Sequence, residues 1–387
     1  CGELTLDLIE SNILSRLPIK DLFRYQCVCK RWRDEIKNPK FIKSHTFHVV
    51  NNHTNSRGSV ILFSRSSAKL YSLDFHSPEN VKKVIRLSHS FDYDTRLVGS
   101  CNGLLCFKLT GWFLIYNPAI QACKTVCVSP FGTKYRMGFG YDCTSDDYKI
   151  LQTETVNTAR CDGHPKQVES HVYSLRNNSW KVVQKPLMVS LSTYSNRMIL
   201  SNNVLHWIDL DYKPRNNMTT GFIMSKIITC FDLGTEEYHK LPLPNDDNDD
   251  GVIISELADS KGYLHLVKYS MIRSSLHKME IWIMKEYGVE QTWSKLVSIK
   301  LDDIIADIVR RQVRKPFLPL LLAYSEDGQE ILVDLGQYSE DGMIFVQCDM
   351  RSGGFKRLEI QVCDLAADFR DGYVVMPWVG SFVSPSM

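Results

Sequence analysis

A chain of 387 residues, 44% of them hydrophobic, can bury a large core, and it exceeds the roughly 100 to 200 residues of one compact domain. Its 46 lysines and arginines nearly balance its 44 aspartates and glutamates, so the formal net charge of +2 argues against a protein that binds nucleic acid or a membrane surface. An aromatic content of 11% argues against disorder. The composition therefore predicts a globular protein with one large and one small domain, or with two medium ones.

The N-terminus and the cysteines indicate where the protein acts. No run of about eighteen apolar residues occurs, and no basic segment precedes an apolar one at the N-terminus, so neither a membrane span nor a secretory signal is expected. Cys1 stands where a methionine would start the chain, which suggests that a few residues are missing. The 12 cysteines are scattered, unlike the dense disulfide frameworks of short secreted chains. We expect reduced thiols in a cytoplasmic or nuclear protein.

Residues 1–45 carry a helical pattern. Apolar side chains recur every three or four residues at Leu6, Ile9, Ile13, Leu14 and Leu17, and Pro18 then breaks the pattern. Asp21 can cap a second helix that continues to Ile36 and stops at Asn38-Pro39. Two or three short helices are expected. Because so short a segment buries little apolar surface by itself, its apolar stripe must contact either the rest of the chain or a partner.

This helical segment also has a family resemblance. From Leu17 to Arg33 it reads LPIKDLFRYQCVCKRWR, and with the following Asn38-Pro39-Lys40-Phe41 it closely resembles the F-box of plant F-box proteins. The resemblance implies an all-α F-box domain over residues 1–45 that binds a Skp-type adaptor and, through it, a cullin scaffold. Carried over by position, the adaptor-binding or F-box-core residues would be Leu4, Leu17, Pro18, Leu22, Val28, Cys29 and Trp32.

Two departures from the family pattern lie near the start of the chain. Thr5 follows Leu4 where family members usually have proline, and the interval from Asp7 to Pro18 is one residue longer than usual. One added residue rotates a helix by about 100°. Either the first helix begins differently in this chain, or its affinity for the adaptor is reduced.

From about residue 46 the apolar pattern changes to a period of two, which is typical of strands. The clearest runs, bounded by glycine, asparagine, aspartate or proline, are residues 59–63, 103–107, 112–116, 279–284 and 331–334. Only Asp302 to Val313 has helical spacing. The body of the chain is therefore expected to be all-β, with one short connecting helix.

A degenerate repeat runs through this body. Its unit is an asparagine or aspartate, a turn and, six positions later, a large residue, and the clearest copies begin at Asn117, Asp232 and Asp349. The sixth positions fall at residues 123, 180, 238, 293 and 355, which are 57, 58, 55 and 62 apart. Repeats built from four short strands are typical of propeller blades. We expect a closed propeller of six blades, with the first supplied by a further copy near residues 73–84.

The body has a family resemblance of its own. Residues 97–104, 116–119, 138–142, 146–150, 172–175 and 281–289 look like the F-box-associated, kelch-like domain of plant F-box proteins. The resemblance extends nearly to the end of the chain and implies that residues 46–387 form the propeller. Within the family the chain is similar to both the defence-regulating and the S-locus pollen F-box groups.

No motif in the sequence predicts catalysis, a metal site or a cofactor. His206 and His265 occupy the same phase of two repeat units, which indicates a blade-packing position. Gly138 and Gly140 lack the third glycine of a dinucleotide loop and are interpreted as a strand-end turn. An acidic run imitates a calcium loop but lacks its final glutamate, so we interpret it as a solvated loop that could bind a basic target. Its candidate target-binding residues are Asp246, Asp247, Asp249 and Asp250.

The segments best suited to target recognition are the expected loop insertions. They span residues 153–169, 209–225, 245–251 and 269–278. Loops on a rigid scaffold can vary at little cost to the fold. The tryptophans at 112, 180, 207, 282 and 293 are assigned mostly to blade cores.

The two family resemblances therefore imply a non-enzymatic substrate receptor of a Skp–cullin–F-box (SCF) ubiquitin ligase. Its F-box would bind the adaptor, and its propeller would bind a target protein for ubiquitination and proteasomal degradation. For the S-locus relatives the target is a basic secreted ribonuclease (S-RNase), which would suit the acidic loop. One alternative is a propeller enzyme or carbohydrate-binding protein with a helical leader, which would place convergent polar groups in the central channel. Another is an F-box protein that acts outside a ligase.

Overall fold

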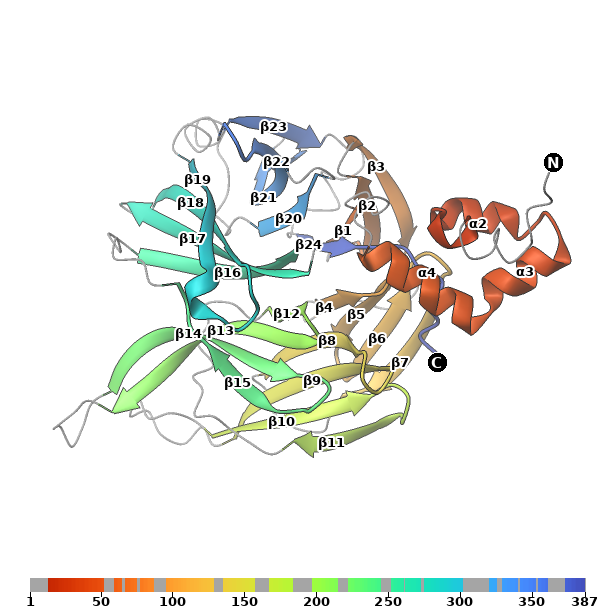
Figure 1. The fold of residues 1–387 in the computed structure, drawn as a ribbon, viewed down its shortest axis with the longest axis horizontal. Helices are drawn as coiled ribbons and strands as arrows, with labels where there is room; N and C mark the ends of the chain where they lie inside the picture. The colour runs from red at the N-terminus through yellow and green to blue at the C-terminus, as the bar shows by residue number, and fades with distance from the viewer. Residues whose placement is uncertain are drawn as a thin grey trace.

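The computed structural model describes residues 13–51, 59–64, 67–74, 77–86, 95–128, 135–156, 167–183, 197–214, 222–244, 252–260, 262–272, 275–301, 320–325, 329–339, 342–352, 354–360 and 373–386. A small helical unit precedes a propeller of six four-stranded sheets (Figure 1). The expected fold class, short N-terminal helices followed by an all-β propeller with six blades, is confirmed. The helix expected at 302–313 lies outside the described residues.

From residue 13 on, the helical unit contains the 3₁₀ turn η1 (Leu14–Arg16) and the helices α2 (Ile19–Tyr25), α3 (Lys30–Lys37) and α4 (Pro39–Asn51). The expectation of one helix from Asp21 to Ile36 is wrong, because two helices share this segment. Asp21 does not cap α2, since Pro18 precedes the helix and Asp21 lies in its first turn. There its carboxylate forms an exposed ion pair with Arg24, at 3.2 Å.

Two helix boundaries, at Cys29 and at Asn38-Pro39, differ from those expected from the sequence. Cys29 is extended, and its sulfur accepts a hydrogen bond from the amide of Trp32 (3.5 Å), so that it caps α3. Asn38-Pro39 starts α4 rather than ending the helical unit, because proline suits the first position of a helix. The Asn38 side chain accepts a hydrogen bond from the amide of Lys40 (3.0 Å). α4 continues through the expected domain boundary at 45/46, and the first strand in the described residues begins at Ser59.

Each blade has four strands, which follow one another from the propeller axis outward. Blade 1 contains β24 (Tyr373–Trp378), β1 (Ser59–Ser64), β2 (Lys69–Asp74) and β3 (Ser77–Arg86). Blade 2 contains β4 (Arg96–Cys101), β5 (Leu104–Leu109), β6 (Trp112–Asn117) and β7 (Ala122–Cys127). Blade 3 contains β8 (Tyr135–Asp142), β9 (Asp147–Val156), β10 (Gln167–Ser174) and β11 (Ser179–Val183).

The other three blades follow in chain order. Blade 4 contains β12 (Ile199–Ser201), β13 (Val204–Pro214), β14 (Phe222–Asp232) and β15 (Tyr238–Leu241). Blade 5 contains β16 (Val252–Ser260), β17 (Tyr263–Ile272), β18 (Ser275–Met284) and β19 (Trp293–Lys300), with the 3₁₀ turn η2 (Glu290–Thr292) before β19. Blade 6 contains β20 (Leu320–Tyr324), β21 (Glu330–Ser339), β22 (Gly342–Asp349) and β23 (Phe355–Ile360).

The last strand closes the ring. β24 pairs antiparallel with β1, from Ser59 opposite Trp378 to Ser64 opposite Tyr373. The innermost strand of blade 1 therefore comes from the C-terminal end of the chain, and backbone hydrogen bonds join the two ends of the propeller sequence.

The sequence repeat marks the hairpin between the third and fourth strands. Residues 123, 180, 238, 293 and 355 all lie at the first or second position of an outermost strand. The aspartate or asparagine before the hairpin accepts amide hydrogen bonds from the turn, as Asp232 does from Gly234 (2.7 Å) and Thr235 (2.9 Å). The further copy near residues 73–84 is also found, because Asp74 ends β2 and β3 follows. One such turn per blade explains the interval.

The expectation that Gly138 and Gly140 form a strand-end turn is wrong, because both lie inside β8. A β carbon on Gly138 would lie 2.7 Å from Cδ1 of Leu205, and one on Gly140 would lie 2.7 Å from Cδ1 of Leu200. Side chains of blade 4 therefore pack directly on the backbone of the innermost strand of blade 3. Glycine permits this close approach.

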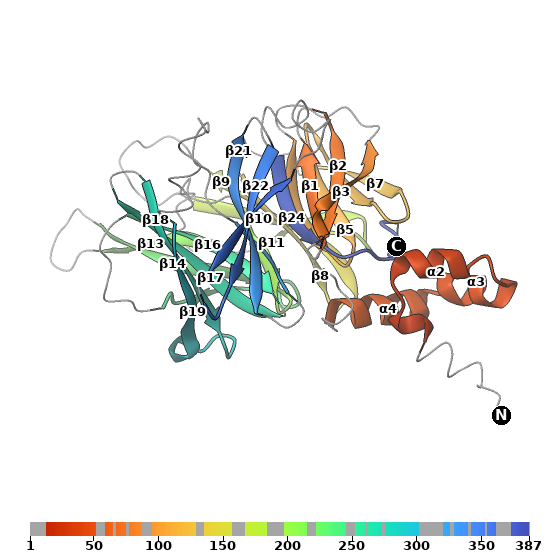
Figure 2. The same cartoon turned by 90° about the horizontal axis from the view of Figure 1, so that it is seen from above.

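The helical unit lies beside the propeller and not within it (Figures 1 and 2). The first-to-second and third-to-fourth strand turns of each blade lie on one face, since neighbouring strands are antiparallel. We call this the near face, because its turns at Asn102, Asn117 and Asp146 contact the helical unit or the C-terminal residues. The second-to-third strand connections and those between blades belong to the opposite, far face.

Candidate functional site

The helical unit has a small core of its own. Leu14, Leu22, Ile36, Phe41 and Phe382 are buried in it, and Leu17, Ile19, Tyr25, Trp32, Ile42 and Ile120 pack against them. Among the expected adaptor-binding residues, Leu22 is thus fully buried, while Leu17 and Trp32 are half-buried. These three side chains hold the helices together, and Leu22 offers no surface to a partner.

Other expected residues do face solvent. Val28, in the turn between α2 and α3, is 61% exposed, and Pro18 and Cys29 are exposed as well. Leu4 lies outside the described residues. Sequence reasoning missed Phe47, which is 71% exposed on α4, because residues after 45 were assigned to strands. The helical unit therefore exposes the apolar side chain of Val28 to solvent.

The C-terminal strap, residues 379–386, joins the helical unit to blade 2. The side-chain amide of Asn117 donates hydrogen bonds to the carbonyl oxygens of Ser381 (3.0 Å) and Val383 (2.7 Å). The Ser381 hydroxyl donates to the carbonyl of Asn102 (2.6 Å). The next residue, Phe382, enters the core of the helical unit, with its ring centroid 4.7 Å from that of Phe23. Nothing in the sequence pattern indicated this role of the strap.

α4 provides the second connection to the propeller. Nζ of Lys43 lies 2.8 Å from Oδ1 of Asp146, in the turn between β8 and β9. Ile42 packs against the apolar cluster between blades 2 and 3. Within the helical unit, Nε2 of His45 lies 2.9 Å from the carbonyl oxygen of Leu17. The helices are therefore held in a defined position relative to the propeller.

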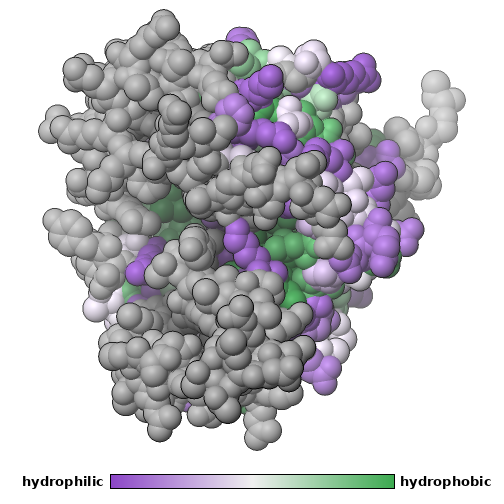
Figure 3. All heavy atoms as spheres, turned by 90° about the vertical axis from the view of Figure 1, so that its left-hand side faces the viewer, coloured by the Kyte–Doolittle hydropathy of each residue, from purple (hydrophilic) through white to green (hydrophobic). Residues whose placement is uncertain are grey.

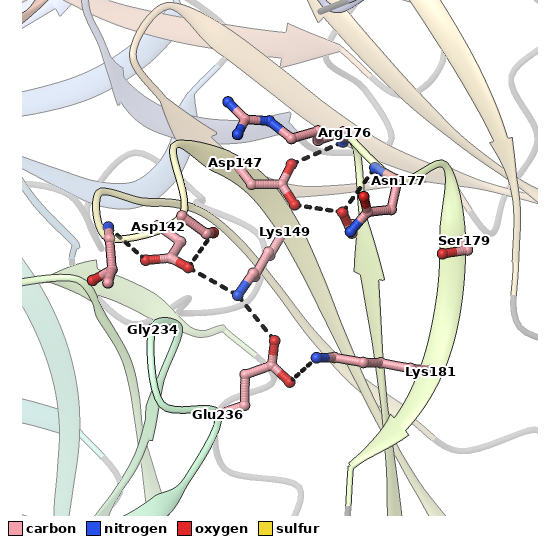
Figure 4. Close-up of a pocket in the computed structure, with 12 residues that line it drawn as sticks. Asp142, Asp147, Lys149, Arg176, Asn177, Ser179, Lys181, Gly234 and Glu236 are labelled. Atoms are coloured by element: carbon pink, nitrogen blue, oxygen red, sulfur yellow. Dashed lines mark hydrogen bonds and ion pairs between the residues drawn. The ribbon is translucent and has the colours of Figure 1, made fainter.

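A polar pocket of about 420 Å³ lies between blades 3 and 4 (Figure 4). At its centre Nζ of Lys149 lies 2.9 Å from Asp142 and 2.9 Å from Glu236, and it donates to the carbonyl of Leu233 (2.6 Å). Lys181 contacts the other oxygen of Glu236 at 2.7 Å. The pocket thus contains an ion-pair network that links β9 of blade 3 to the β14–β15 turn of blade 4.

The charges of this network stabilise one another. Burial opposes ionisation of Asp142, but hydrogen bonds from Ser145, Lys149 and the Thr144 amide outweigh it and lower the pKa of Asp142 to about 2. Burial likewise disfavours the charge on Lys149, yet its bonds to Asp142 and Glu236 raise its pKa overall. The network therefore acts as a brace between blades.

Charged groups also gather inside the propeller. Nη1 of Arg136 lies 3.4 Å from Oδ2 of Asp209, and both side chains are 1% exposed. The indole of Trp207 donates to the same carboxylate at 3.2 Å. The alternative interpretation as a propeller enzyme predicts convergent polar groups in the channel. Arg136 and Asp209, however, bind each other and neighbouring strand residues, as in a packing contact.

The two repeated histidines fit a packing role. His206 is buried with Nε2 2.7 Å from the Tyr287 hydroxyl, and Nδ1 of His265 lies 2.9 Å from the carbonyl of Tyr263. Burial lowers the pKa of each imidazole to about 4, so both are neutral near pH 7. Within the described residues, no three histidine, cysteine, aspartate or glutamate side chains are grouped to hold a metal ion.

The described ends of three candidate recognition segments, 153–169, 209–225 and 269–278, lie on the far face. Three of them join the second and third strands of blades 3, 4 and 5, and the fourth joins blade 4 to blade 5. Asp246, Asp247, Asp249 and Asp250 lie outside the described residues. On the same face Trp112 is 50% exposed at the start of β6, so its assignment to a blade core is wrong, whereas Trp207 and Trp293 are buried. On the side of the molecule away from the helices, described hydrophobic residues are set back between hydrophilic ones (Figure 3).

No helix within the described residues is long and apolar enough to span a membrane. Nine cysteines in those residues are free thiols. Burial raises the pKa of Cys101 and Cys230 to about 12, so these two stay protonated and inert near pH 7.

Comparisons with known proteins agree with both parts of the structure. The model of the F-box domain matches residues 8–44, and that of the F-box associated beta propeller domain matches residues 59–340. An F-box/kelch-repeat protein of Arabidopsis thaliana is 29% identical over 310 residues, which cover 76% of this chain and 79% of the relative. The Arabidopsis thaliana F-box protein CPR1 is 27% identical over 378 residues, 92% of this chain and 84% of the relative.

Solved structures resemble the chain more distantly. A fungal alcohol oxidase of the AA5 family in complex with copper has a TM-score of 0.41 and 13% identity, over 81% of this chain and 64% of that chain. This likeness carries no functional argument. The two domain matches, which together extend over the helical unit and most of the blades, show that the chain belongs to the F-box proteins with an F-box-associated β-propeller domain.

Proposed function

We propose that the protein is the substrate-recognition subunit of an SCF-type ubiquitin ligase. The observation that carries the proposal is an F-box that lies outside the propeller and keeps Val28 exposed to solvent. The match to the F-box domain implies a Skp-type adaptor as the partner, and Val28 is an exposed apolar side chain on this segment that the adaptor could cover. The partner is the Skp-type adaptor, which links the chain to a cullin.

The adaptor would contact Pro18, Val28 and Cys29, the exposed members of the set taken from the family resemblance. Leu17, Leu22 and Trp32 would act indirectly, because they fix the helices that present these residues. Leu4 stays a predicted adaptor contact.

The target protein would bind the far face of the propeller, where four candidate loop segments and the exposed Trp112 occur. Exposed aromatic side chains often anchor protein interfaces. A basic target for the acidic run at 246–250 stays a prediction.

The contribution to ubiquitin transfer would be proximity. The strap and α4 hold the F-box in a defined position on the propeller, so a bound target is held near the ligase core. This raises the effective concentration of its lysines without bond chemistry by this chain. Such a receptor would work in the cytoplasm or nucleus, which is consistent with the free thiols.

A pull-down with the Skp-type adaptor tests the proposal. Val28→Asp places a charge where we expect an apolar contact, and the loss of the contact between the exposed valine and the adaptor should weaken binding about tenfold or more. Val182→Asp is the matched control, because Val182 is 58% exposed on β11 of blade 3. Adaptor binding that is equal for wild type and Val28→Asp, or equally weakened in the control, would contradict the proposal. Proximity labelling with the proteasome blocked would then identify the target.

A further inference from the structure

The central channel of the propeller contains a cavity of about 270 Å³. It is lined by residues of the innermost strand of every blade, among them Met376, Cys101, Phe139, Ile199, Leu257 and Leu321. Val50, from the last turn of α4, also lines it. The cavity therefore lies where the end of α4 meets the near face of the propeller, and most of its wall is apolar.

Three charged residues line this cavity: Arg197, Glu256 and Asp259. Burial disfavours the charge on Arg197, and the carboxylates of Glu256 and Asp334 favour it. The positive charge of Arg197 is thus already matched by acidic groups, and the lining as a whole carries one positive and two negative charges. The surplus charge in the cavity is negative.

The Asp259 carboxylate in this lining is only partly hydrogen-bonded. Its Oδ2 is buried and has no hydrogen-bond partner among the described residues. Burial raises the pKa of Asp259 to about 6, and the hydrogen bond with Ser201 offsets only part of that effect. A buried acceptor without a hydrogen bond raises the free energy of the folded protein. A hydrogen bond from a ligand to Oδ2 would therefore be strongly favourable, and more so if the donor carries a positive charge.

We propose that the central cavity binds a small organic cation, with an ammonium group that donates to Oδ2 of Asp259 and an apolar body that contacts the aromatic and aliphatic wall. Phe139 and Trp378 supply aromatic surface for that body. A metal ion suits the site less well, because among the described residues no three ligating side chains come together.

The larger pocket between blades 3 and 4 contains no comparable unpaired charged group in its ion-pair network. Its lining contains Asp142, Asp147 and Glu236 against Lys149, Arg176 and Lys181, so its charges balance. Lys149 is bonded to two carboxylates and a carbonyl. A ligand there would have to break this network, whereas a cation in the central cavity would complete an unmet interaction.

Occupancy would also affect the junction of the two domains. Val50 belongs to α4 of the helical unit, and Trp378 ends the strand that leads into the strap. A ligand in contact with both would add to the contacts that hold the F-box on the propeller. This binding activity does not depend on the ligase function proposed above.

The test uses the full chain with ¹³C-labelled methionine methyl groups and 2-phenylethylammonium chloride as the probe. Met198 and Met376 line the cavity, whereas Met284 is buried in the cluster between blades 4 and 5. We expect saturable shifts of the Met198 and Met376 signals and no shift of Met284. The matched anion 3-phenylpropionate should shift none of them. No shift at Met198 and Met376, or equal shifts with the anion, would overturn the proposal.

A variant pair tests the role of the carboxylate. Asp259→Asn removes the charge with little change in shape and should weaken probe binding about ten- to a hundredfold, as expected for loss of a charge-assisted hydrogen bond. Glu237→Gln removes one exposed negative charge in the β14–β15 turn and should leave binding unchanged. Equal affinity in wild type and Asp259→Asn would refute the assigned contact. The wild-type methionine shifts remain decisive if that variant does not fold.

Discussion

Removal of the Phe382 ring tests whether the F-box depends on the C-terminal strap. Phe382 is 8% exposed and is one of five buried residues that form the core of the helical unit in the described part of the chain. Substitution of a core phenylalanine by alanine costs about 3 to 5 kcal/mol. We expect Phe382→Ala to cost about 3 kcal/mol, the lower end of that range, because the ring keeps some solvent contact. For so small a core, this loss would open the F-box locally while the blades stay folded.

Hydrogen exchange followed by mass spectrometry measures this effect region by region. A loss of about 3 kcal/mol speeds exchange of α2 and α3 amides about a hundredfold, if they exchange by local opening. Phe382→Leu keeps most of the apolar volume and should cost less than about 1.5 kcal/mol. Phe355→Ala, at a 43% exposed position on β23, should change the stability by no more than about 0.5 kcal/mol. Unchanged exchange in α2 and α3, or equal acceleration in all six blades, would refute the reasoning.

Three other predictions concern the joints between elements. Asn117→Ala leaves the carbonyls of Ser381 and Val383 and the amide of Ala119 without their partner, and should lower the free energy of unfolding in urea by about 2 to 4 kcal/mol. Gly138→Ala brings a methyl group to 2.7 Å from Leu205 and should cost about 1 to 3 kcal/mol in the same assay, with no loss if blade 4 were not packed there. The pKa of Asp142 is lowered to about 2, so its stabilising contribution is present above the ordinary value of 3.8 and is lost as the pH falls toward 2. Urea unfolding from about pH 5 to about pH 2 should show this loss, and Asp142→Asn should reduce it.

The propeller could be predicted because its signal is local and repeated. Each turn that contains Asp232 or its equivalents is built from neighbouring residues, so the interval between turns gives the blade count. The F-box could be predicted from a contiguous motif. Both signals depend on residues that are close in the sequence.

The joints could not be predicted because they depend on contacts between distant segments. Asn117 reads as one more turn residue, yet its amide also holds the strap, 264 residues further along the chain. Gly138 reads as a turn glycine because only the tertiary structure brings Leu205 against it. Asn38-Pro39 is compatible with either the end or the start of a helix. In the structure it starts α4, and this helix contacts the propeller through Lys43. The unpaired Oδ2 of Asp259 likewise has no sequence signature.

The most direct measurement of the central claim is the hydrogen-exchange footprint of the Skp-type adaptor on the full chain. The account predicts slowed exchange in α2, α3 and the turn at Val28, and no change on the far face around Trp112. A footprint confined to the propeller, or no footprint at adaptor concentrations that saturate other F-box proteins, would contradict the assignment of the helices as the adaptor-binding surface.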